Sequence, residues 1–206
     1  MQYLRKKYLY KPKFWPQWFG VGVLKLLSVL PFSVQRKIGC GLGLLCYKIL
    51  SSRRRIADKN LQACFPLLSS EEREALLKQH FVALGQGIVS VGMGWWASKK
   101  RLKRFIQKVD GLENIEAAFA RGKGVILLSA HFTADEIGGR LIAELVEQPL
   151  NVMHREQSSE VFESVIGKAR HGYLNHVILR DNVKTMIKCL KNNEGVYYLP
   201  DQNFEE

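Results

Sequence analysis

The chain has 206 residues, 47% of them hydrophobic and 24% charged, which suits one globular domain of ordinary size with an appendage. The net charge of +12 lies in residues 1–60, which hold 13 Lys and Arg against the single acid Asp58, whereas residues 61–206 are neutral. The four cysteines have no CxxC or His-paired spacing, so their pattern indicates neither a zinc site nor a disulfide framework.

The basic front segment also carries two apolar runs, at 19–32 and 38–50, with Trp15 and Trp18 near the first. Aromatic and basic residues beside apolar runs are typical of a membrane interface, and nucleic-acid-binding arms lack such runs. Each run is shorter than the roughly 20 residues of a spanning helix, and Pro31 separates them. We therefore predict that residues 1–52 form a membrane-anchoring helical segment, as a hairpin or in-plane pair. A single tilted span and two buried helices of a soluble domain are the alternatives.

The middle of the chain is predicted to be helical. The stretch SSRRRIADKNLQACFP (51–66) ends a helix at Pro66, and Ser70 is expected to cap a long helix that runs to about Ser98. The basic amphipathic stretch 99–108 is either a solvated helix face or a contact surface for anionic lipid or an acidic carrier.

From Val109 onward, after a short helix closed by glycines, predicted strands alternate with predicted helices. This alternation is typical of βαβ units, so residues 53–206 are predicted to form an α/β domain with a mostly parallel sheet flanked by helices. The expected strands are 125–130, 150–153, 176–179 and 195–200, and the expected helices are 133–147, 158–170 and 182–193.

Each predicted strand is followed by polar or charged residues. The strand ends carry, in chain order, His131, Met153-His154-Arg155, Arg180-Asp181 and Asp201-Gln202. Ligands of parallel sheets bind beyond the carboxyl ends of the strands. We therefore expect an active site at this edge.

His131 has two explanations that the local sequence leaves open. Thr133 and Glu136 match a T-x-x-E capping box, which explains the acid without any chemistry. The same first helical turn points back toward His131, so that Glu136 could orient the imidazole. Asp135 lies about 100° further round the helix and is the less favoured partner.

A histidine held by a carboxylate is a general base that can deprotonate a hydroxyl. The chain has no G-x-S-x-G elbow, so the direct reading is that His131 activates a hydroxyl of the substrate itself. The attacked carbonyl then needs oxyanion stabilisation, for which Arg155 is the candidate. The alternative role of Arg155 is a salt bridge to Glu156 or Glu160.

Five ordered blocks resemble the late acyltransferases of lipid A biosynthesis, the lauroyl and myristoyl group within the glycerolipid-type acyltransferases. Their H-x4-(D/E) signature is met by His131 and Glu136. The blocks are NLQACFP (60–66), VDGLENI (109–115), SAHFTADEIGG (129–139), MHRE (153–156) and RDNVKTMIKCLKNNEGVYYLPDQNF (180–204).

The resemblance implies transfer of an acyl chain from an acyl-carrier-protein thioester to a hydroxyl of a 3-hydroxyacyl chain. The acceptor would be a Kdo-lipid IV-A-type lipid A precursor at the cytoplasmic face of the inner membrane. His131 would be the base, Glu136 its partner, Arg155 the motif arginine and Asp201 the aspartate of the PDQ motif. The sequence has no metal or nucleotide motif, and a thioester donor supplies its own activation, so we expect no metal and no cofactor.

Family members continue beyond residue 206 with further strands and a helical portion. One alternative function is therefore an inactive membrane-binding fragment or scaffold. A lipid thioesterase that uses the same histidine to activate water is another.

Overall fold

A computed structural model describes residues 7–201, which fall into two compact units. One unit combines the chain up to Val23 with everything from Met93 onward and contains the sheet. The other comprises Leu24–Gly92 and is helical.

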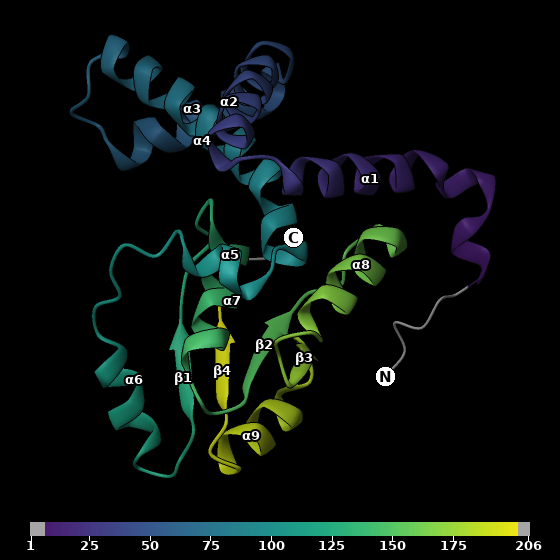
Figure 1. Cartoon of the computed structure of the whole chain (residues 1–206). Helices are drawn as coiled ribbons and strands as arrows, with labels where there is room; N and C mark the ends of the chain where they lie inside the picture. Colours follow the sequence, from purple (N-terminus) through teal and green to yellow (C-terminus); the bar gives the residue numbers. More distant parts are fainter. Residues whose placement is uncertain (1–6, 202–206) are drawn as a thin grey trace. The chain divides into compact units, whose positions relative to one another are not determined.

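The sheet has four strands, β1 (Val125–Leu128), β2 (Leu150–His154), β3 (His176–Leu179) and β4 (Gly195–Tyr198). Their spatial order is β1-β4-β2-β3, and every pairing is parallel. The predicted α/β fold with a mostly parallel sheet is thereby confirmed. The last strand in sequence lies between the first and the second, so residues that follow β4 lie beside residues that follow β1 (Figure 1).

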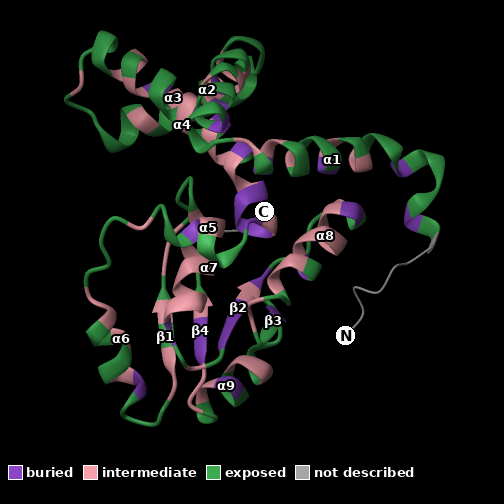
Figure 2. Cartoon of the chain, viewed as in Figure 1, coloured by how far each residue is buried: buried purple, intermediate pink, exposed green. Residues whose placement is uncertain are grey.

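Each face of the sheet is covered by helices. On one face, α6 (Leu112–Phe119) and α7 (Asp135–Leu145) bury a cluster built on Phe119, Val146 and Leu150. On the other face, α9 (Val183–Lys191) buries Ile178, Cys189 and Val196. The middle strands β2 and β4 are therefore the most buried part of the sheet (Figure 2).

The beginning of the chain packs on the sheet unit. Short 3-10 helices at Lys7–Tyr10 and Pro12–Phe14 lead into α1 (Trp15–Val29). Leu9, Phe14 and Val21 form a buried cluster with Val161 of α8 (Glu160–Arg170). A hydrogen bond of 2.8 Å from Ser159 Oγ to Gln17 Oε1 reinforces this contact.

The helical unit contains α2 (Phe32–Ile49), α3 (Ser51–Cys64) and most of α4 (Ser70–Trp96). Helices α2 and α4 approach each other at glycines. A Cβ placed on Gly85 of α4 would lie 2.2 Å from the Gly39 carbonyl, and one on Gly43 of α2 would lie 2.2 Å from the Phe81 carbonyl. These backbones touch directly, so only glycine fits at either position.

The predicted helices of the front half are present with small shifts. The two apolar runs lie on separate helices, α1 and α2, on either side of Pro31. The start of α4 is capped by Ser69 rather than Ser70: Ser69 Oγ accepts from Glu72 N at 3.2 Å and Glu72 Oε2 accepts from Ser69 N at 2.8 Å.

No helix within residues 7–201 is long and apolar enough to cross a membrane. The anchoring role of residues 1–52 stays a prediction.

The glycine contact generates a stability prediction. Gly85→Ala is expected to lower the free energy of unfolding by about 2 kcal/mol or more, because its methyl group would overlap the α2 backbone. Gly41→Ala on α2 is the control, because nothing lies within 4 Å of its new Cβ. This change is expected to leave the free energy of unfolding unchanged or to raise it by up to about 1 kcal/mol. Urea unfolding of both variants measures the difference. Equal stabilities would contradict the close contact.

Candidate active site at the carboxyl edge of the sheet

His131 lies in the loop between β1 and α7. Strand β1 ends at Leu128, so the predicted strand, which ran to residue 130, is two residues too long. The Asp201 carboxylate holds His131 twice: Oδ2 accepts from the backbone N at 2.9 Å, and Oδ1 lies 2.8 Å from the ring Nδ1. Asp201 follows β4, the strand next to β1, and this neighbourhood brings the two residues together.

This pairing sets the chemistry of the imidazole. A carboxylate only accepts hydrogen bonds, so Nδ1 carries the proton toward Asp201 and Nε2 is the atom that can take one from a substrate. Hydrogen bonds from the backbone and the ring of His131 lower the pKa of Asp201, which keeps it charged at neutral pH. The side chains of His131 and Asp201 are 44% and 34% exposed, so the pair is accessible to substrate.

Glu136 has different partners. Arg170 binds its carboxylate with two nitrogens, at 2.7 and 3.1 Å, and the Tyr173 hydroxyl donates to it at 3.0 Å. Burial alone would raise the pKa of Glu136, but Arg170 and Tyr173 outweigh burial and lower it. The bidentate pair joins the start of α7 to the end of α8.

The Arg170 guanidinium also reaches the end of β2. Its Nη1 lies 3.0 Å from Nδ1 of the buried His154, while Nε2 of that ring lies 2.9 Å from Glu163 Oε2. Arginine can only donate, so Nδ1 accepts and Nε2–H donates to Glu163. A continuous polar network therefore runs from Glu163 through His154 and Arg170 to Glu136.

Asp135 faces the sheet. Tyr197 lies 2.9 Å from Asp135 Oδ1 and 2.8 Å from Ser129 Oγ. The phenol has one proton, so Tyr197 donates to Asp135 and accepts from the Ser129 hydroxyl. Burial raises the pKa of Asp135, and burial with the nearby Asp135 charge raises the pKa of Tyr197 to about 12.

The structure unites only some of the residues that sequence reasoning assigned to the site. Within residues 7–201, His131 is hydrogen-bonded to Asp201, and the hydrogen bonds of Glu136 go to Arg170 and Tyr173 instead. The predicted capping box is wrong, because α7 begins at Asp135 after Ala134 and has no side-chain cap. Arg155 follows β2 at the surface. Gln202 lies outside the described residues, and the catalytic roles stay predictions.

Sequence reasoning missed Arg170 and Tyr173. Their partner Glu136 lies 34 and 37 residues away along the chain, and no local pattern connects them. The tautomer of His154 and the Tyr197 contact likewise depend on the strand order, which spacing along the sequence does not specify.

An open apolar groove of about 500 Å³ runs along α7. Its walls are this helix and the stretch that precedes α6. The residues that line it are Gly138, Leu141, Ile142, Leu145 and 105–109.

The Glu136–Arg170 pair generates the second prediction. Glu136→Gln is expected to lower the free energy of unfolding by about 3 kcal/mol, because it leaves the Arg170 charge largely buried without a counter-charge. Asp110→Asn is the matched control. It removes one partner of the Lys108–Asp110 pair, which has the same 2.7 Å separation but is exposed, so its expected cost is below about 0.5 kcal/mol.

The pH dependence of unfolding checks the same pair. The folded-state pKa of Glu136 lies below its ordinary value of 4.5, so its stabilisation is present above that pH and is lost as the pH falls through the lowered pKa. The acid loss of stability should therefore be shallower in Glu136→Gln than in the unmodified chain. Identical slopes in urea unfolding between pH 5 and pH 2 (roughly the range in which such a carboxylate titrates) would contradict the assignment.

The chain is similar to curated proteins of known name. It is 34% identical over 193 residues to the lipid A biosynthesis palmitoleoyltransferase of Escherichia coli (strain K12), covering 94% of this chain and 62% of that protein. It is 32% identical over 196 residues to the lipid A biosynthesis lauroyltransferase of the same organism, covering 95% of this chain and 63% of that protein. A lipid A biosynthesis acyltransferase of Haemophilus influenzae is 30% identical over 195 residues, 94% of this chain and 61% of that protein.

The chain thus spans a little over three-fifths of the length of these curated relatives. The profile of the family described as bacterial lipid A biosynthesis acyltransferase matches residues 3–206, so the chain belongs to that family.

Proposed function

We propose that the protein transfers an acyl chain from an acyl-carrier-protein thioester to a hydroxyl of a 3-hydroxyacyl chain on a Kdo-lipid IV-A-type lipid A precursor. The observation that carries the proposal is the His131–Asp201 pair, an accessible imidazole with its base nitrogen left for substrate. The family of the chain supports the class of acceptor.

The pair can perform the whole acyl transfer in two steps, attack and collapse. His131 Nε2 takes the proton of the acceptor hydroxyl as the oxygen attacks the thioester carbonyl. Asp201 stabilises the imidazolium that forms. When the tetrahedral intermediate collapses, the C–S bond breaks and the imidazolium returns its proton to the leaving thiolate. The products are an ester and a free thiol, and the histidine ends as it began.

Two other features would assist this step. Arg155 follows β2 at the same edge of the sheet and would donate to the oxyanion, which carries the negative charge of the intermediate. The groove along α7 offers an apolar surface for a hydrocarbon chain, with Gly138 leaving open space beside the helix.

The acidic acyl carrier protein would meet the short helix α5 (Lys99–Lys103). Leu102 is fully buried and anchors this helix, and Ser98 caps its start. The lysines at 99, 100 and 103 are exposed around it. Such a basic surface steers an acidic partner and makes the encounter salt-dependent.

We also propose that the protein works at the cytoplasmic face of the inner membrane. One side of α1 exposes Trp15, Phe19, Leu26 and Val29, which are between 63% and 76% accessible. Their spacing places them within about 80° of arc on one helix face. An apolar stripe in a segment with an excess of Lys and Arg is typical of a helix that lies in the surface of an anionic bilayer.

The third prediction tests the catalytic pair. His131→Ala and Asp201→Asn are each expected to lower acyl transfer at least 100-fold, because one removes the base and the other removes the group that fixes its tautomer. Asp181→Asn is the control, since this aspartate also follows a strand at the same edge but its side chain is 88% exposed. Transfer of labelled acyl chain to a lipid A precursor is the measurement, with unfolding curves taken in parallel.

The same assay separates the alternatives. Full activity of folded Asp201→Asn would contradict the pair. Release of free fatty acid by the unmodified protein without acylation of the acceptor would indicate a thioesterase instead. Absence of both reactions in folded protein that still binds vesicles would favour a membrane-binding role.

The fourth prediction tests the α1 stripe. Replacing Phe19 and Leu26 together by serine is expected to weaken binding to vesicles that contain anionic phosphatidylglycerol roughly 30-fold, because about 2 kcal/mol of apolar burial is lost. Leu67→Ser is the control, since Leu67 is 97% exposed outside the stripe. Vesicle sedimentation measures both. Equal loss of binding in the control, or none in the double variant, would contradict the assignment.

A further inference from the structure

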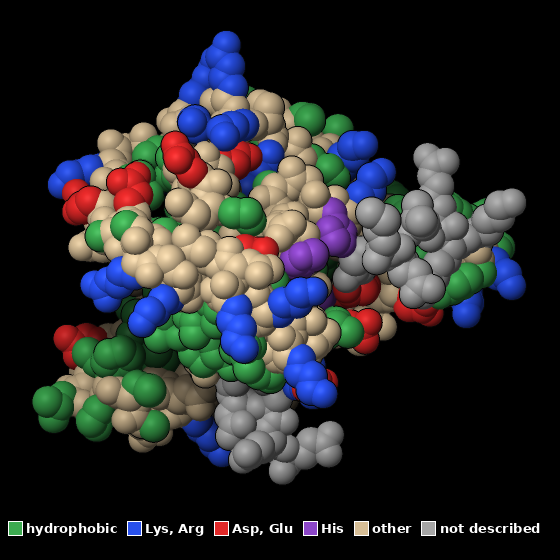
Figure 3. Space-filling view, turned by 90° about the horizontal axis from the view of Figure 1, so that it is seen from below, with side chains coloured by type: hydrophobic (Ala, Val, Ile, Leu, Met, Phe, Trp, Pro, Cys, Tyr) green, Lys and Arg blue, Asp and Glu red, His purple; other side chains and the backbone are tan. Residues whose placement is uncertain are grey.

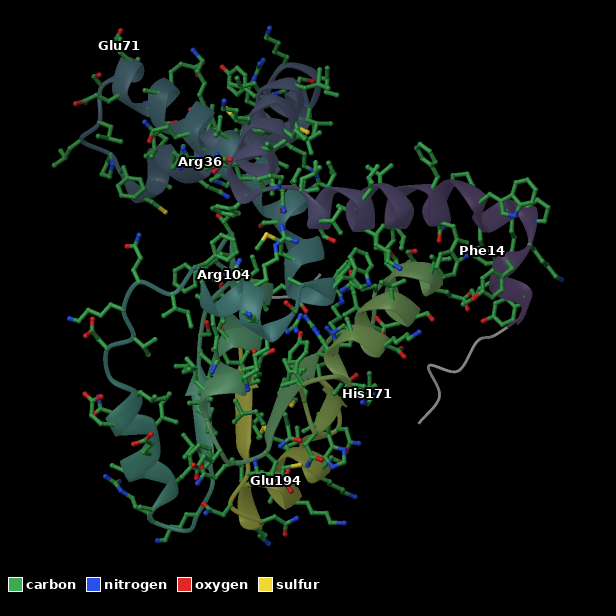
Figure 4. The ribbon with its side chains drawn as sticks, in the orientation of Figure 1. Phe14, Arg36, Glu71, Arg104, His171 and Glu194 are labelled. Atoms are coloured by element: carbon green, nitrogen blue, oxygen red, sulfur yellow. The ribbon has the colours of Figure 1, made fainter. Side chains whose placement is uncertain are left out.

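A cluster of different side chains lies at the edge of the sheet opposite His131. His176 begins β3, Cys189 lies in α9 and Glu194 directly precedes β4. The ligand atoms of all three lie within 4.8 Å of one another. Figure 4 shows Glu194 at this end of the sheet next to α9, and in Figure 3, which views the molecule from this end, histidine side chains reach the surface.

Two amides, of the buried Asn151 and the exposed Asn175, hold Glu194 in place. Its Oε2 accepts from Asn151 Nδ2 at 2.9 Å and from Asn175 Nδ2 at 3.1 Å, and the Cys189 thiol is also hydrogen-bonded to the carboxylate. Burial alone would raise the pKa of Glu194, but these hydrogen bonds outweigh it and lower the pKa.

Two polar groups of this cluster are not fully paired. Within residues 7–201, the partly buried Glu194 carboxylate accepts hydrogen bonds but forms no ion pair. The Oδ1 atom of Asn151, a residue with no exposed surface, has no hydrogen-bond partner. A thiol, an imidazole and a carboxylate whose ligand atoms lie this close together, beside a buried amide oxygen without a partner, are what a metal site presents before the ion binds.

The thiol, the imidazole and the carboxylate could also suggest a cysteine nucleophile. Burial and the hydrogen bond to Glu194 raise the pKa of Cys189 to about 11, and its side chain is 3% exposed. A nucleophilic cysteine needs a lowered pKa and access to substrate, so this reading fails.

We propose that His176, Cys189 and Glu194 form a zinc-binding site. One sulfur, one nitrogen and one oxygen ligand suit Zn²⁺, and water would complete a tetrahedron. Ligand atoms around tetrahedral zinc lie roughly 3.5 Å apart, so the cluster has to contract by about 1 Å, and the exposed His176 ring can supply that movement. Binding displaces the Cys189 proton, and the ion would join the starts of β3 and β4 to α9.

Cobalt(II) reports this site spectroscopically, because a thiolate ligand gives a sulfur-to-cobalt charge-transfer absorption. The full chain carrying serine at the other cysteines, Cys40, Cys46 and Cys64, is expected to bind one equivalent of Co²⁺ with this absorption, and Zn²⁺ should abolish it by displacement. Adding Cys189→Ser should remove the absorption. His176→Gln and Glu194→Gln should each weaken binding at least tenfold.

His80→Gln is the matched control, since it removes an exposed histidine on α4. It should leave both the affinity and the spectrum unchanged. Zn²⁺ should also raise the melting temperature of the unmodified chain and not that of His176→Gln, a surface change that leaves the core intact. Absence of the charge-transfer absorption, its survival in Cys189→Ser, or unchanged affinity in folded His176→Gln would each overturn the proposal.

Discussion

The site depends on the buried pair of Glu136 and Arg170. This pair joins the first turn of α7 to the last turn of α8, and through His154 it reaches the end of β2. Two charges removed from water are tolerated only when their hydrogen-bonding groups are satisfied, and here Tyr173 and Glu163 complete the network. The network fixes where α7 begins, and so limits the loop that carries His131.

Both carboxylates at the start of α7, those of Asp135 and Glu136, are therefore hydrogen-bonded to residues other than His131. Consecutive helical residues point about 100° apart, so Asp135 faces Tyr197 of the sheet while Glu136 faces α8. The acid that pairs with His131 comes instead from the chain after β4. This arrangement requires β4 to insert beside β1, a feature of the strand order and not of the local sequence.

The elements and the parallel sheet could be predicted because hydrophobic periodicity records burial within each segment. His131 and Asp201 could be singled out because polar residues follow strand ends. Their pairing could not be predicted, since it depends on which strands are neighbours. The predicted capping box was wrong although Thr133 and Glu136 have the spacing of that motif. The Glu136 carboxylate binds Arg170, which is distant in sequence, in place of the backbone at the start of the helix. The cluster of His176, Cys189 and Glu194 was invisible for the same reason: its members have no motif spacing and meet only in the fold.

A signature residue can be essential without touching the reacting atoms. If Glu136 acts through Arg170, its loss is expected to disturb the loop and to lower stability together with activity, whereas loss of Asp201 is expected to lower activity alone. Asp201 is at the surface and its hydrogen bonds go to the exposed His131 of a loop, so we expect the fold not to depend on it. Stability and activity should therefore separate at Asp201 and fall together at Glu136. A carboxylate that fixes the imidazole and a carboxylate that fixes the scaffold are thus distinguishable, although both lie at the same edge of the sheet.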